Sequence, residues 1–229
     1  MNVKNKKTYY QIILDKSGSM NDCIESTVNG FNEQMQMIKG LQDKFPEQEI
    51  LVSLTTFNHD VFFDVECASP SELKEMKSNF KSISWFENTN DFVIYEPDGM
   101  TSLYDAIGDS VNKIQSISEK EVLEDKATVV VVIITDGYEN SSQKYNYSQI
   151  QSMIKELERS DNWTFSYLSN TIDAIENATD LNIKSSNSFM YSKSNMSNVY
   201  DDMNDSLDAY MSKKSNNIKE KQFLKWKNR

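Results

Sequence analysis

Histidine and cysteine are scarce in this sequence, which limits the chemistry it can support. The chain has one histidine and two cysteines in 229 residues. Cys23 and Cys67 form neither a C-x-x-C pair nor any spacing typical of a zinc site. His59 falls in a predicted turn between two strands, so catalysis through an imidazole is nearly excluded.

Long apolar runs are also lacking, and turn-forming residues are few. No segment approaches the about 18 consecutive apolar residues that a membrane helix requires. The basic start, residues 1–7, is not followed by the apolar core and cleavage site of a signal peptide. Six glycines and three prolines mark no linker. These features favour one domain, at residues 8–212, in a cytoplasmic protein that contacts no membrane.

Charge is distributed unevenly along the chain. The formal net charge is −11, yet residues 213–229 form a basic tail with seven lysines or arginines and one glutamate. The acidic remainder would repel a phosphate backbone, so nucleic acid is not an expected ligand. The tail could contact nucleic acid or an anionic membrane, but a basic run of this kind is typically a solvated terminus, and we expect that here.

Apolar periodicity alternates between strands and helices. Composition rich in β-branched and aromatic residues predicts strands at 8–14, 50–57, 128–135, 163–168 and 189–191. Apolar stripes at helical spacing predict helices at 24–39, ended by Gly40, at 103–114, at 150–157 after a Ser148 cap, at 172–178 and at 199–211.

The stretch between the second and the third long strand is harder to interpret. Residues 59–65 alternate as a hairpin partner of strand 50–57, with the turn at 58–60. The motif Ser-Pro-Ser-Glu at 69–72 predicts a capping box that opens a helix through about Phe80. Residues 85–96 read as irregular with one short extended piece. The fold class is therefore α/β, with a doubly wound, mostly parallel sheet, one antiparallel edge strand and helices on both faces.

Oxygen-bearing side chains gather where predicted strands end, and ligands of open α/β sheets bind at that edge. Asp15, Ser17 and Ser19 follow the first strand, Thr101 precedes a helix, and Asp136 follows the central strand. Half of the six glycines, which permit tight turns and close backbone approach, lie in the same loops: Gly18, Gly99 and Gly137.

This set of two carboxylates and three hydroxyls contains no thiolate or imidazole. All-oxygen ligands of low total charge suit a hard cation, Mg²⁺ before Zn²⁺ or Cu²⁺, with Mn²⁺ or Ca²⁺ also possible. Because neutral hydroxyls leave the charge of the cation largely unquenched, a carboxylate from a partner could complete the coordination shell.

The same residues resemble the metal-ion-dependent adhesion site of von Willebrand factor A domains. The resemblance covers about residues 8–211 in element order and rests on three runs, Asp-Lys-Ser-Gly-Ser-Met at 15–20, Gly-Met-Thr-Ser-Leu-Tyr-Asp-Ala at 99–106 and Thr-Asp-Gly-x-Glu-Asn at 135–140. No ligand position is substituted. The runs look like those of the stand-alone bacterial branch.

The resemblance implies a role for each position. Ser17, Ser19 and, in the ligand-competent state, Thr101 would bind the cation directly, while Asp15 and Asp136 would act mostly through water or one direct bond. Two further residues, Asp105 and Glu139, are candidates for supporting these ligands. Similar stand-alone proteins work beside chaperone-like ATPases or kinase and phosphatase modules in stress responses.

The expected function is a non-catalytic domain that uses Mg²⁺ to bind an Asp or Glu of a partner protein in a bacterial regulatory assembly. One alternative is a Mg²⁺-dependent phosphoryl hydrolase or transferase with Asp15 as nucleophile and Asp136 holding the ion. Those enzymes usually carry a second aspartate where this chain has Ser17, and no catalytic lysine can be placed. The other alternative is a metal-free structural adaptor, because each motif alone is also an ordinary turn or helix cap.

Overall fold

The central sheet is built on two strands that are buried along nearly their whole length. The computed structural model describes residues 5–79, 81, 83–84, 87–171 and 173–225. The first strand, β1 (Lys7–Asp15), pairs in parallel with β6 (Ala127–Thr135), all nine residues of which are buried. Continuous β-branched runs suit a strand that is covered on both faces, as β6 is.

Four more strands extend this pair. The order is β3-β2-β1-β6-β7-β8, with β2 (Glu49–Phe57), β7 (Trp163–Ser169) and β8 (Ser188–Met190) parallel to their neighbours. Only the edge strand β3 (Val61–Ala68) runs antiparallel within this sheet as described. The predicted fold class, including the antiparallel edge, is confirmed.

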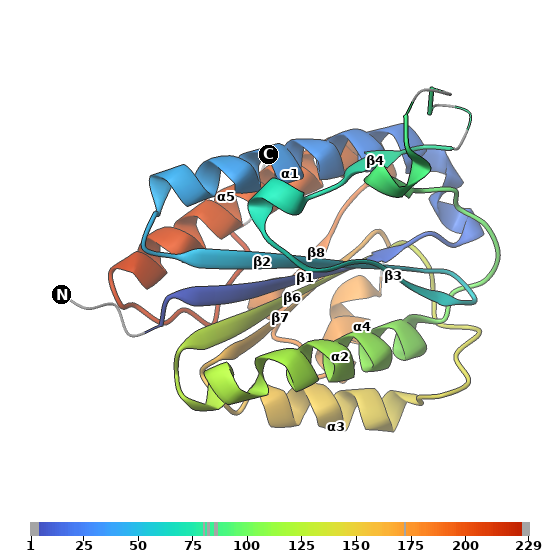
Figure 1. Ribbon diagram of the computed structural model, residues 1–229. Helices are drawn as coiled ribbons and strands as arrows, with labels where there is room; N and C mark the ends of the chain where they lie inside the picture. The colour runs from blue at the N-terminus through green and yellow to red at the C-terminus, as the bar shows by residue number, and fades with distance from the viewer. Residues whose placement is uncertain (1–4, 80, 82, 85–86, 172, 226–229) are drawn as a thin grey trace.

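Helices cover both faces of the sheet (Figure 1). On one face lie α1 (Ile24–Lys44) and α5 (Met196–Ser215), and on the other α2 (Leu103–Leu123), α3 (Tyr147–Leu157) and α4 (Ala174–Asp180). Alternate residues of β6 divide between two apolar clusters, Val130 and Val132 facing α1 and α5, Val129 and Val131 facing α2 and α3. Because successive side chains of a strand point to opposite faces, β6 packs against both helix layers.

The prediction of a helix that begins at residue 69 is wrong. The capping box between Ser69 and Glu72 is present, but it closes only a 3-10 turn, Pro70–Glu72. The chain then extends into β4 (Glu75–Lys77), which pairs with β5 (Phe92–Ile94), the short extended piece predicted within 85–96. The side chain of Asn32 bonds both backbone groups of Met76, so pairing with distant segments replaces the local helical preference. Residues 80, 85 and 86 lie outside the described part.

Two predicted helix ends are also corrected. Helix α1 passes through Gly40 to Lys44, because Leu41 continues its buried stripe. Helix α3 is capped by Asn146 rather than by Ser148, with the amide of Gln149 donating to the Asn146 side chain at 3.1 Å. The short helix predicted at 172–178 is α4, whereas residue 172 lies outside the described part.

The basic tail is not wholly solvated, because Lys214, Phe223 and Leu224 are buried, while residues 216–219 are exposed. Phe223 and Leu224 are each 1% exposed, and the ring of Phe223 lies 5.9 Å from that of Tyr210. Asn187 holds this segment by accepting the amide of Phe223 at 2.9 Å and donating to the carbonyl of Lys221 at 2.8 Å. Burial of Phe223 and Leu224 therefore holds this part of the basic tail against the domain. No helix in the described part of the chain is long and apolar enough to cross a membrane.

We expect Phe223→Ala to lower the free energy of unfolding by about 3–5 kcal/mol, since a buried aromatic ring is lost from a packed cluster. Urea unfolding of the variant and the wild type measures this difference. Lys225→Ala, at an exposed position of the same segment, is the matched control and should unfold as the wild type does. Equal midpoints for all three proteins would show that the segment does not stabilise the fold.

Candidate metal centre

Asp15 is the buried anchor of the candidate site. It ends β1 and is 0% exposed. Its Oδ1 accepts the amide of Ser17 at 2.6 Å, and its Oδ2 accepts the hydroxyl of Thr135 at 2.6 Å. The backbone carbonyl of Asp15 accepts the hydroxyl of Tyr95 at 2.7 Å. Both carboxylate oxygens are therefore fixed in position by donors from two neighbouring strand ends.

A row of hydroxyls connects the first loop to the loop after β6. The hydroxyls of Ser17 and Ser19 lie 3.1 Å apart. Ser19 donates its hydroxyl to Oδ1 of Asp136 at 2.5 Å. The first and central strands end side by side, so residues distant in the sequence meet at one edge of the sheet.

Thr101 completes the group from the loop that precedes α2. It is 3% exposed, and its amide donates to the side chain of Asn140 at 2.9 Å. A Cβ placed on Gly137 would lie 2.8 Å from Oγ1 of Thr101 and 3.5 Å from Oδ2 of Asp15. These two oxygens thus border a space that any larger residue at position 137 would fill. The structure brings together all five residues that the sequence singled out.

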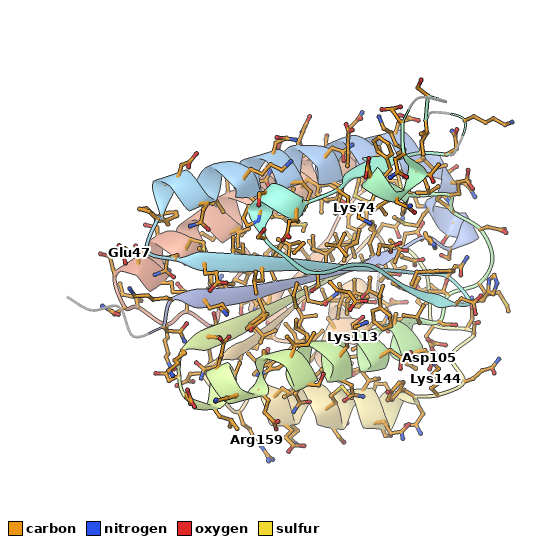
Figure 2. All side chains as sticks on the ribbon, viewed as in Figure 1. Glu47, Lys74, Asp105, Lys113, Lys144 and Arg159 are labelled. Carbon is orange, nitrogen blue, oxygen red and sulfur yellow. The ribbon has the colours of Figure 1, made fainter. Side chains whose placement is uncertain are left out.

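Asp105 and Glu139 hold the loops around this group. Asp105 accepts the backbone amides of three consecutive residues at 2.9 Å each, from Gln143 to Tyr145. Figure 2 shows Asp105 beside Lys144 near the start of α2. Glu139 accepts the amide of Tyr104 at 2.9 Å. These bonds tether the loop after β6 to α2, so both carboxylates act on the position of the loops.

Burial dominates the electrostatics of the site. Desolvation raises the pKa of Asp15 to about 6, and the nearby charge of Asp136 adds to this rise. Hydrogen bonds from Thr135 and Ser17 oppose it. Two carboxylates placed together with little water favour an added positive charge between or beside them.

Lys193 supplies a positive charge that the sequence analysis missed. Its Nζ lies 2.6 Å from Oδ2 of Asp136, whose side chain is fully buried, and donates to the carbonyl of Ser19 at 2.6 Å. Burial lowers the pKa of Lys193, but the bond and charge of Asp136 outweigh this effect and the pKa is raised overall. The segment around Lys193 carries no motif. Thr135 was also missed, although its place at a strand end before Asp136 was a usable signal.

The donor set fits a hard divalent cation. Among the described residues, Oδ2 of Asp136 accepts no hydrogen bond of normal geometry, so its one close partner is the ammonium of Lys193. No group of three histidine, cysteine, aspartate or glutamate side chains is close enough to hold a metal in the described part. A site here would have to combine hydroxyls with the two carboxylates, a set of oxygen ligands that suits a hard divalent cation.

Comparison with known families agrees with this architecture. A family model described as the von Willebrand factor type A domain matches residues 11–206. The chain therefore belongs to the von Willebrand factor type A domain family. A search of curated proteins found no match.

Solved structures of low sequence identity share the fold. Proximal thread matrix protein 1 from the mussel byssus, in a form described as having a zinc-occupied MIDAS motif, is 13% identical with a TM-score of 0.59, over 91% of this chain and 48% of that one. The PilB minor pilin of Streptococcus sanguinis is 11% identical with a TM-score of 0.54, over 90% of this chain and 62% of that one. This chain spans about half the length of the mussel protein.

In EDTA, which removes metal, we expect the free energy of unfolding to fall as pH rises, because the Asp15 carboxyl loses its proton. Its pKa is about 6 in the folded protein against an ordinary 3.8, so the folded state holds the proton more tightly. The stability that this proton contributes is complete below about pH 4 and is lost as pH rises through about 6, a loss of about 3 kcal/mol.

Urea unfolding of wild type and Asp15→Asn in EDTA, from about pH 4.5 to about pH 7.5, measures this contribution. The asparagine variant is uncharged at every pH and should lack the decline. The same pH dependence in both proteins would contradict the assignment.

Proposed function

We propose that this chain is a non-catalytic domain that binds a partner protein by coordinating one of its Asp or Glu carboxylates through a bound Mg²⁺ ion. The supporting observation is the convergence of three hydroxyls and two buried carboxylates, of which Thr101 and Asp15 border the side-chain-free space at Gly137 and the other three are joined to Asp15 by hydrogen bonds. Within a family of interaction domains, this arrangement supports the adhesion site that the sequence predicted.

Each residue has a role in this proposal. Ser17, Ser19 and Thr101 would hold the cation through their hydroxyls, and Asp15 and Asp136 would hold it through water or one direct bond. Two supporting residues, Asp105 and Glu139, would keep the loops in place. Mg²⁺ is the ion we propose, with Mn²⁺ and Ca²⁺ as further candidates for the same oxygen ligands.

A bound cation would also resolve the charge problem of an acidic domain that binds an acidic group. The net charge of the chain is −11, which disfavours a carboxylate on the partner. A divalent ion held largely by neutral hydroxyls remains a local positive charge and attracts that carboxylate. This favours a partner that presents an Asp or Glu at the tip of a loop.

The cellular setting stays a prediction. We propose a stand-alone bacterial protein of the cytoplasm, acting beside a chaperone-like ATPase or a kinase or phosphatase module. The zinc-occupied MIDAS motif named for the mussel structure supports a divalent cation in this fold.

Asp15 is poorly placed to act as the nucleophile of a phosphoryl hydrolase or transferase. It is 0% exposed, and both of its carboxylate oxygens already accept hydrogen bonds. A nucleophile needs an oxygen that can approach phosphorus, so this arrangement favours binding over catalysis. The metal-free adaptor has one observation in its favour, the Lys193 ammonium beside Asp136, and metal titration separates it from our proposal.

We expect Mg²⁺ to raise the thermal midpoint of the wild type in a saturable way, because an ion that binds only the folded state stabilises it. At about a hundred times the dissociation constant the rise should be about 5–10 °C. Ser17→Ala should abolish most of it, while Ser152→Ala, at an exposed position of α3, should keep it in full. Flat curves for the wild type would favour the adaptor.

Binding of a partner should depend on the same ion. Capture of cellular proteins on the immobilised chain in Mg²⁺ should yield a partner that EDTA releases and that Ser17→Ala fails to retain. A partner retained equally in EDTA and in Mg²⁺ would show that recognition does not pass through the cation.

A further inference from the structure

Lys193 reaches the candidate metal centre from a part of the chain that none of the predicted ligands occupies. It lies in the one-turn segment Lys193–Asn195, between β8 and α5. Its ammonium lies 2.6 Å from Oδ2 of Asp136, donates to the carbonyl of Ser19 at 2.6 Å and lies 3.8 Å from Asp22. The side chain is 25% exposed, so part of it borders solvent.

The contacts of Lys193 fall on residues that a cation would need. One oxygen of Asp136 accepts the hydroxyl of Ser19, and the other faces the ammonium. The Asp136 side chain is 0% exposed, and Lys193 is its ion-pair partner among the described residues. Lys193 thus supplies the charge that a divalent ion would otherwise supply at this carboxylate.

The backbone on either side of Lys193 is fixed, whereas its side chain has room to move. Tyr191 is 4% exposed and donates its hydroxyl to the carbonyl of Thr135 at 3.3 Å, and Met196 is fully buried. These two residues hold the short segment beside the end of β6. The long lysine side chain can still turn outward into solvent, because it is partly exposed and has several rotatable bonds.

We infer that Lys193 is an internal competitor of the divalent cation, which holds Asp136 in the metal-free protein and must release it before Asp136 can serve the ion. This inference rests on the proposed function. A fixed ammonium repels a divalent ion placed at the same carboxylate, so the lysine weakens the intrinsic affinity of the site. If the ion pair is closed in about nine molecules of ten, the apparent affinity is about tenfold lower than that of the open site.

One consequence is that cation and partner assist each other. A site that is weak alone is filled more readily when the carboxylate of a partner adds its own bond to the ion, because each ligand then shares the cost of releasing Lys193. The competitor would thereby keep the domain largely metal-free until a partner is present.

Calorimetric titration with Mn²⁺ alone tests the inference on the full chain. Lys193→Gln should bind about tenfold more tightly than the wild type, because the competing charge is gone. Lys193→Arg retains the charge and should remain weak. Lys155→Gln, which removes one positive charge from an exposed position of α3, is the control for net charge and should bind as the wild type does.

Thermal unfolding gives a second readout of the same four proteins. In EDTA, Lys193→Gln should melt below the wild type, since Asp136 is left buried without its cation. In saturating Mn²⁺ its gain should exceed that of the wild type. A variant with the wild-type midpoint in EDTA would show that the ion pair does not form, and would overturn the inference.

The outcomes separate this inference from the proposed function. If the wild type and Lys193→Gln bind Mn²⁺ with equal affinity, or the variant binds more weakly, the inference fails and the metal site stands. If none of the proteins binds Mn²⁺, the proposed function fails, and the inference fails with it.

Discussion

The parallel pairing of β1 with β6 is the constraint on which the rest of the structure depends. Both strands are buried along nearly their whole length, and Leu14 lies opposite Ile134 in their register. This alignment puts Asp15 beside Thr135 and leaves Asp136 one residue further along the same edge. Because the strands are covered on both faces, the carboxylates of Asp15 and Asp136 at their ends are both buried. The helices, the loop tethers and the candidate metal centre are all arranged around that edge.

The parts of the fold that follow from local composition were predictable from the sequence. A run such as residues 129–134, all valine or isoleucine, predicts a buried strand or a buried helix. Its short length and the turns on either side of it favour the strand. The strand at residues 75–77 was not predictable, because its conformation depends on Asn32 and on pairing between β4 and β5, contacts that the local sequence does not contain. Phe223 was obscured by the charges around it, although an aromatic residue in a basic run is itself a sign of packing.

The candidate site divides in the same way. The five predicted residues stand at the ends of β1 and β6 and in the loop before α2, where the topology brings them together, so a pattern in the sequence was sufficient to find them. Lys193 has no such pattern. Its approach to Asp136 depends on where β8 ends and α5 begins, and on the burial of Tyr191 and Met196 on either side of it. A lysine among serines and asparagines looks like any exposed residue until the chain is folded.

A further step follows from the way the structure stabilises its two buried carboxylates. Asp15 accepts hydrogen bonds from an amide and a hydroxyl, which offset only part of the cost of its burial, whereas Asp136 has a hydroxyl and an ammonium as partners. A structural metal site behaves differently, because its ligands repel one another until the ion arrives and folding then depends on the ion. Here the two carboxylates have donors within the chain, which is the arrangement expected of a site that binds its ion after folding. Binding free energy that is not used for folding is available for recognition, and a site whose own lysine can replace the ion is suited to binding that ion conditionally.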